Sequence, residues 1–367
     1  MDSDVTNYFD AMQIGGNRVD ANINVTVFDV TKWNVILPNN KQYTPKIGYM
    51  GLAENNGPSP DKTPPGILKQ LKSNKTIGSR SFGMHLGSAT LQQSGSLILG
   101  GYDQSRALGD VGKWGFDDAL GLYLKDVTLG VEQGGSPFSG INITKTSPAS
   151  LWKGLEGSEV GRNNTRQSGG PDGSAITAPL TSFSSFYLPK GNCEAVAEHL
   201  PVTWRKDIGY YVWNTKNEQY NKIISSPAYL GFVFATPEAK NITIKVPFGL
   251  LNLTLESPIV DSPTPYFPCQ PYDGMTGVWP LGRAFLQAAF MHVDFEKGAI
   301  YLAQGPGPTL EQSVIQSCNP GDSIKTNPIS SFAKTWQDHW TVLAEDGKSE
   351  DKKRKKGLAP VRLPALW

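Results

Sequence analysis

The sequence has little of what marks a membrane-spanning or polyanion-binding protein. Its longest nearly unbroken apolar run, residues 228–235, is far shorter than the roughly twenty residues that a membrane-spanning helix needs. The formal net charge is only +1, so no whole-molecule field attracts nucleic acid or an anionic membrane. A secretory signal begins with basic residues and an apolar core, whereas this chain opens Met-Asp-Ser-Asp. We therefore expect no nucleic-acid partner, no membrane span and no signal peptide in this chain.

Cysteine and histidine are also scarce, with three and four residues. The histidines stand at positions 85, 199, 292 and 339, and none has metal-ligand spacing from another histidine or a cysteine. A Gly-x-Ser-x-Gly elbow, a Walker loop and a dinucleotide fingerprint are all missing. We expect no cofactor and no metal site.

Glycine and proline, by contrast, are abundant. The 39 Gly and 27 Pro accompany a hydrophobic share of 38% and no heptad or helical stripe, which predicts many short strands joined by tight turns. With 367 residues the chain is long enough for two globular units, because single hydrophobic cores usually stop growing at about 250–300 residues. The sequence therefore predicts a mainly β protein with two lobes.

The glycosylation signal Asn-x-Ser/Thr is more frequent than chance. The chain has 21 Asn, for which roughly three such signals are expected from composition. It carries six, at Asn24, Asn74, Asn142, Asn163, Asn241 and Asn252. This excess favours passage through the secretory pathway.

Several stretches, in the right order, resemble fungal secreted or cell-surface pepsin-like aspartic peptidases. Residues 281–296, Leu-Gly-Arg-Ala-Phe-Leu-Gln-Ala-Ala-Phe-Met-His-Val-Asp-Phe-Glu, are similar to the closing unit of that family's second lobe. Tyr-Met-Gly-Leu at 49–52 resembles the equivalent hydrophobic-hydrophobic-glycine element of the first lobe. Ser-Leu-Ile-Leu-Gly-Gly-Tyr-Asp at 96–103 resembles the strand and turn that end that lobe. The resemblance spans about residues 5 to 305.

The resemblance implies a bilobal, pepsin-like acid protease fold with a truncated first lobe. Residues 1–118 would be the remnant of the first lobe, 119–305 the second lobe, and 306–367 a polar, disordered tail. Gly51 and Gly282 would be equivalent structural glycines in the two lobes. Cys193 and Cys269 match the family's second-lobe disulfide positions, which implies that they pair and that Cys318 stays free; three reduced thiols are the alternative.

The family's catalytic residues are missing from the sequence. Such enzymes use two aspartates, one per lobe in an Asp-Thr/Ser-Gly turn, that share a proton because two close carboxylates cannot both ionise cheaply. No Asp-Thr-Gly or Asp-Ser-Gly triplet occurs here. Residues 8–16 resemble the strand just after the family's flap hairpin, so the catalytic turn of the first lobe is expected before Met1.

The second-lobe aspartate position lies inside the chain. Counting back from Phe-Tyr-Leu-Pro at 186–189 puts the lost aspartate at Leu180, or at Ala178 if two residues are inserted. Neither side chain can hold a proton. Asp172 begins a similar triplet, Asp-Gly-Ser, but it lies eight residues too early and is interpreted as an ordinary turn aspartate.

These observations lead to a main functional hypothesis and two alternatives. The main one is a catalytically inactive member of the family, secreted or at the cell surface, monomeric, with an interlobe cleft that binds an extended peptide or protein. The first alternative is an active aspartic endopeptidase whose full gene product restores the missing segments. The second is a noncatalytic cell-surface glycoprotein that uses the lobes only as a stable body.

Overall fold

The computed structural model describes residues 5–16, 19–30, 35–36, 38–44, 48–53, 64–115, 121–155, 173–272, 277–318 and 323–345. Within these ranges most of the regular structure is β-strand, in several sheets, which confirms the predicted mainly β class. Among the helices of the described ranges, none has the length and apolarity to cross a membrane.

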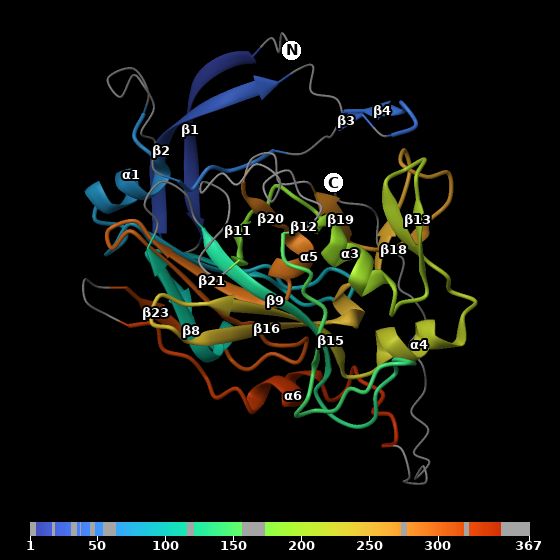
Figure 1. The fold of residues 1–367 in the computed structure, drawn as a ribbon. Helices are drawn as coiled ribbons and strands as arrows, with labels where there is room; N and C mark the ends of the chain where they lie inside the picture. Colours follow the sequence, from blue (N-terminus) through green and yellow to red (C-terminus); the bar gives the residue numbers. More distant parts are fainter. Residues whose placement is uncertain are drawn as a thin grey trace.

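The N-terminal region consists of two hairpins and a helix. Strands β1 (Val5–Gly16) and β2 (Val19–Val30) form a long antiparallel ribbon that projects from the body (Figure 1). A second hairpin, β3 (Val35–Ile36) with β4 (Gln42–Tyr43), is much shorter. Helix α1 (Ile67–Ser73) packs its buried residues against β2.

A five-stranded antiparallel sheet joins the early and late parts of the chain. Its order is β6-β5-β21-β22-β8, so two C-terminal strands lie between strands from the first third of the sequence. The strands are β5 (Ser81–His85), β6 (Ser96–Leu99), β8 (Leu108–Gly115), β21 (Ala289–Asp294) and β22 (Ala299–Gln304). The sequence boundary predicted near residue 118 is therefore crossed by continuous β-pairing.

The largest sheet has eight strands and includes the region of the predicted active site. Its main order is β16-β15-β9-β11-β20-β12-β19, with β10 (Ala149–Ser150) on β9. The bounds are β9 (Leu122–Val131), β11 (Ala175–Pro179), β12 (Phe186–Pro189), β15 (Ala228–Ala235), β16 (Asn241–Pro247), β19 (Cys269–Tyr272) and β20 (Trp279–Leu281). The continuous apolar run of β15 suits a strand that is covered on both faces.

A four-stranded sheet, β13-β14-β18-β17, stands beside it. Its strands are β13 (Val202–Arg205), β14 (Tyr210–Trp213), β17 (Leu253–Leu255) and β18 (Thr264–Phe267). The helical segments of the described chain that remain are η1 (Gln104–Arg106), α3 (Lys190–Ala197), α4 (Glu218–Ser225), η3 (Phe248–Leu250), α5 (Arg283–Leu286) and α6 (Ser331–Trp336).

The predicted disulfide is confirmed. Cys193 on α3 is bonded to Cys269 on β19, with 5.8 Å between the two Cα atoms. Both cysteines are fully buried, and Cys318, which is also buried, takes no part in a disulfide. The bond ties the helix that follows β12 to the strand that pairs with β12, so it braces one edge of the large sheet.

The core beneath this edge is built of aromatic rings in edge-on contact. The Phe186 ring lies 5.2 Å from that of Phe232 and 5.8 Å from that of Phe267, and Phe232 lies 5.0 Å from Phe285. Such tilted pairs are worth about 0.5–1.5 kcal/mol beyond the area that they bury. They fix β12, β15, β18 and α5 against one another.

The C-terminal segment differs from its prediction as a disordered tail. Strand β23 (Ile315–Ser317) pairs with β7 (Gly101–Asp103), and α6 packs beneath the body (Figure 1). The composition is polar, but Phe332, Trp336 and Trp340 recur every four residues, which places them on one face of a helical turn. Phe332 and Trp336 are each only 2% exposed. The described chain is therefore ordered as far as residue 345.

This packing yields a test of whether the segment belongs to the cooperative fold. Trp336→Ala should lower the free energy of unfolding by about 3–5 kcal/mol, because it empties a buried indole site. Val342→Ala, at a side chain that is half exposed, should change it by less than about 0.5 kcal/mol. Urea titrations followed by circular dichroism measure both, and equal stabilities would show that α6 contributes nothing to folding.

Candidate functional site

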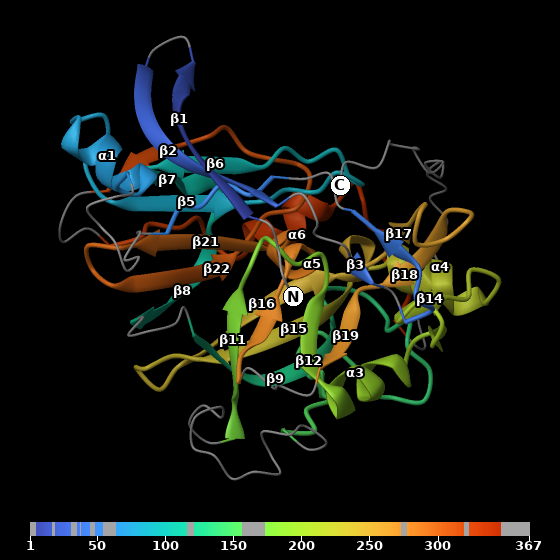
Figure 2. The ribbon, with the colours of Figure 1, turned by 90° about the horizontal axis from the view of Figure 1, so that it is seen from above.

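The site predicted from sequence lies where the chain crosses the end of β20. Strand β20 runs between β11, which is parallel to it, and β12, which is antiparallel. Residues 180–185 join β11 to β12 and must therefore pass over the end of β20. Figure 2 shows β11 and β12 in the foreground with this connection between them, beside α5. We call residues 180–185 the crossing loop.

Backbone hydrogen bonds hold the crossing loop to the start of α5. The amide of Gly282 donates to Ser185 O at 3.1 Å, that of Arg283 to Phe183 O at 2.8 Å, and that of Ala284 to Ser184 O at 2.9 Å. These are amides at a helix start that have no partner within the helix. The Arg283 side chain adds a bond from Nη1 to Thr181 O, 2.7 Å long. All four bonds are accepted by main-chain carbonyls of the loop.

Gly282 is required by this close approach. A Cβ built on it would lie 2.8 Å from the carbonyl carbon of Phe183 and closer still to the carbonyl oxygens of Phe183 and Ser185. Real Cβ atoms do not approach backbone so closely. The glycine therefore permits the loop to cross directly over the strand end.

The two candidate positions for the lost aspartate lie at the entrance to this loop. Ala178 is on β11 opposite Pro280, and its side chain is buried. Leu180 is half-buried, and its amide donates to Leu281 O at 3.0 Å. No aspartate or glutamate occurs in residues 173–189. The loop can offer a ligand hydroxyls and backbone groups, but no carboxylate.

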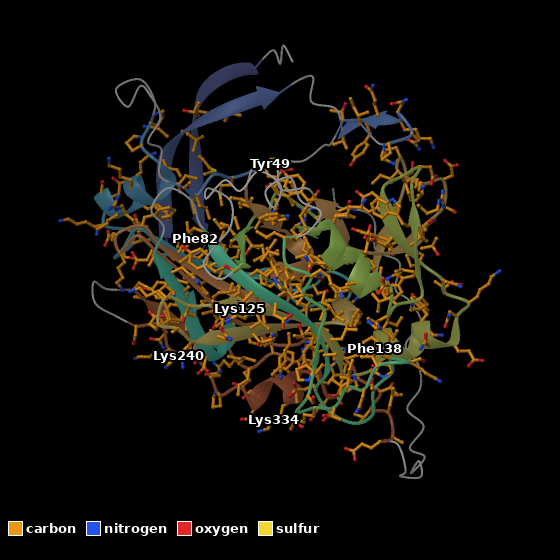
Figure 3. All side chains as sticks on the ribbon, in the orientation of Figure 1. Tyr49, Phe82, Lys125, Phe138, Lys240 and Lys334 are labelled. Carbon is orange, nitrogen blue, oxygen red and sulfur yellow. A yellow bond between two sulfur atoms is a disulfide. The ribbon has the colours of Figure 1, made fainter. Side chains whose placement is uncertain are left out.

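Gly51, the expected first-lobe equivalent of Gly282, has different surroundings. Residues 48–53 form no strand, and a Cβ on Gly51 would meet no atom within 4 Å. Tyr49 and Met50 beside it are 52% and 48% exposed. Figure 3 shows Tyr49 on the upper side of the molecule in that view. Asp172 lies outside the described residues.

A group of tyrosines that the sequence analysis did not predict lies next to the crossing loop. The ring of Phe183 lies 5.3 Å from that of Tyr187, and Tyr187 lies 6.1 Å from Tyr272. Tyr266, on the neighbouring sheet, lies 5.2 Å from Tyr210. Burial raises the pKa of Tyr266 to about 12 and raises that of Tyr210 as well, so both phenols stay neutral at physiological pH.

The histidines do not gather at this site. His85 and His292 are buried, and burial lowers the pKa of each to about 4. His85 Nε2 lies 3.0 Å from Gln287 O, and His292 Nε2 lies 3.8 Å from the Cys318 thiol. Across the described ranges, no three His, Cys, Asp or Glu side chains come close enough together to hold a metal ion.

The structure sorts the glycosylation acceptors by accessibility. Four of the asparagines are exposed: Asn24, Asn74, Asn142 and Asn241. Asn252 is half-buried, and its side-chain oxygen accepts a hydrogen bond of 3.2 Å from the Tyr220 hydroxyl. Asn163 lies outside the described residues.

Comparisons with known proteins add a distant structural likeness. No family model matches the chain, and no curated protein matches it in sequence. Among solved structures, the aspartic proteinase from Irpex lacteus is similar, with 13% sequence identity over 82% of this chain and 83% of that chain, and a TM-score of 0.48.

The crossing geometry predicts a large difference between two glycine substitutions. Gly282→Ala should destabilise the protein by about 1–3 kcal/mol, since the new methyl group must displace backbone that is hydrogen-bonded on both sides. Gly51→Ala should be neutral within about 0.5 kcal/mol, because the site is open. Chemical denaturation measures the free energy of unfolding of both variants. Similar losses of stability would contradict the close approach of the loop to Gly282.

Introducing a carboxyl group tests which position faces the protein interior. Ala178→Asp should destabilise more than Leu180→Asp, because Ala178 is more buried and burial raises the pKa of an aspartate. A folded-state pKa above the unfolded one costs stability at pH 7, where the unfolded chain is ionised, and the cost disappears as the pH falls below the unfolded value of about 4.

Thermal melts at pH 3.5 and pH 7 measure this difference against Ala178→Asn and Leu180→Asn, which carry no titratable group. The aspartate variants should lose about 1–3 kcal/mol more than the asparagine variants at pH 7 and about the same at pH 3.5. A pH-independent deficit at both positions would place both side chains in solvent.

Proposed function

We propose that this chain is a pepsin-like protein that has no aspartic peptidase activity and retains a surface for binding an extended peptide. One observation carries the proposal: the crossing loop, at the place where the family resemblance puts a catalytic aspartate, contains no carboxyl group. Hydrolysis by this mechanism needs two carboxylates that share a proton and activate water. Leucine, alanine and hydroxyl side chains cannot do this.

The local geometry supports the assignment of the crossing loop to that position. Gly282, the structural glycine that the resemblance implies for the second lobe, directly follows β20, which lies between β11 and β12. The Leu180 amide donates a hydrogen bond to Leu281 O. The position inferred for the second-lobe aspartate therefore lies next to Gly282, although about a hundred residues separate the two in the sequence. The proposal is that the second-lobe part of the site keeps its backbone arrangement without the aspartate carboxyl group.

We also propose that the protein works outside the cell or at its surface. The disulfide between Cys193 and Cys269 is supported by the structure, and such bonds persist in oxidising compartments. Four of the Asn-x-Ser/Thr acceptors have exposed side chains that a glycosylating enzyme can reach. Both features fit a secreted glycoprotein.

An activity assay separates this proposal from its main alternative. The purified chain should not hydrolyse denatured protein between pH 3 and pH 5, and an aspartic peptidase inhibitor such as pepstatin should have no effect. A pepsin preparation at the same concentration is the positive control. Hydrolysis that pepstatin abolishes would show an active endopeptidase and overturn the proposal.

A further inference from the structure

The short β3–β4 hairpin lies against the four-stranded sheet. Tyr43, on β4, is half-buried and packs against a small apolar cluster made by Ile208, Leu255, Ile259 and Tyr266. Figure 2 shows β3 beside β17 and β18. A segment from the start of the chain thus covers a surface that is otherwise built from residues 200–272.

Pro38 lies close to Gly209, in the turn before β14. Gly209 has a positive φ of 75°, and a Cβ built on it would lie 3.2 Å from Pro38 Cγ. A side chain at position 209 would therefore press on the hairpin. An ion pair between Lys41 Nζ and Asp261 Oδ1 at 3.6 Å joins exposed groups and contributes little.

The covered surface continues into the crossing loop. Gln270, on β19, donates a hydrogen bond from Nε2 to Gly209 O at 3.0 Å, so the turn before Tyr210 lies beside the strand that carries Tyr272, whose ring is 6.1 Å from that of Tyr187. Tyr187 in turn lies against Phe183 of the crossing loop. A row of aromatic side chains therefore runs from the crossing loop to the hairpin.

We propose that residues 38–44 are a lid on this tyrosine-lined surface, and that the surface binds an extended peptide with an aromatic side chain when the lid is displaced. We call the surface, which consists of Tyr187, Tyr210, Tyr266 and Tyr272, the tyrosine surface. The inference rests on the proposed function and deepens it, because it names the surface and the chemistry of the peptide. Tyr43 is the aromatic group that occupies the surface in this structure.

The hairpin is suited to exchange with a competing ligand. Its strands have two residues each, and an isolated two-stranded hairpin is marginally stable at best in water. Tyr43 and Pro38 supply the apolar contacts, and no disulfide links the described part of the hairpin to the sheet. An incoming aromatic side chain would take the place that the Tyr43 ring now occupies.

The test uses the full chain and a labelled synthetic peptide of residues 35–49 as the probe. Because the tethered hairpin acts as an intramolecular competitor, wild-type protein should bind the peptide weakly. Tyr43→Ala should bind it at least tenfold more tightly by fluorescence anisotropy. Ile36→Ala is the matched control, since Ile36 is on the same hairpin but 61% exposed, and it should behave as the wild type does.

Two further arms locate the binding surface and guard against misfolding. A peptide in which the tyrosine corresponding to Tyr43 is alanine should lose binding, and Tyr187→Ala in the Tyr43→Ala background should weaken binding at least tenfold. Circular dichroism melts confirm that each variant is folded. If Tyr43→Ala fails to fold, Pro38→Gly replaces it, because that change removes the other apolar contact of the lid.

Equal peptide affinity of the wild type, Tyr43→Ala and Ile36→Ala, or no binding by any of them, would overturn the proposal that residues 38–44 are a lid. Binding that survives Tyr187→Ala would refute the tyrosine surface. If the wild type shows no hydrolysis and Tyr43→Ala binds no peptide, this inference is refuted and the absence of peptidase activity still stands. Pepstatin-sensitive hydrolysis would refute the proposed function whatever the result of the peptide-binding assay.

Discussion

The candidate site depends on the passage of the crossing loop over the end of β20. Three consecutive carbonyls of the loop accept from three consecutive amides at the start of α5, and this is possible only because Gly282 has no side chain between the two backbones. The strand order of the large sheet follows from the same crossing, since β11 and β12 lie on opposite sides of β20. The disulfide and the aromatic core then hold β12 from the other side.

A crossing that is fixed by main-chain atoms does not depend on which side chains it displays. The loop can keep its shape without a carboxyl group, since none of the three hydrogen bonds from the α5 amides involves a side chain of the loop. Under the proposed function the same scaffold serves binding without catalysis, and a fold alone does not establish an activity. Here the crossing loop presents Phe183 next to Tyr187 instead of an acid.

Local sequence patterns predicted much of the fold. The abundance of glycine and proline with short apolar runs indicated a β protein, and the family resemblance implied the bond between Cys193 and Cys269. The prediction of a disordered tail was wrong for residues 306–318 and 323–345 because it rested on composition and overlooked periodicity. Three aromatic residues at a spacing of four are enough to anchor a short helix within this polar segment. The expected equivalence of Gly51 and Gly282 rested on similar local sequence. In the structure a Cβ on Gly282 would clash with backbone, whereas a Cβ on Gly51 would meet no atom within 4 Å.

The tyrosine surface had no signal in the sequence because its members are far apart along the chain. Tyr43 and Tyr266 are separated by more than two hundred residues, and each stands in an ordinary strand pattern in which aromatic residues are common. They come together because the hairpin packs on the four-stranded sheet, whose strand β14 contacts β19 at the edge of the large sheet. A binding surface assembled in this way depends on several sheets at once, so a change in any of them alters it. The same assembly lets a short hairpin from the first fifty residues control access to a surface built from residues 187–272.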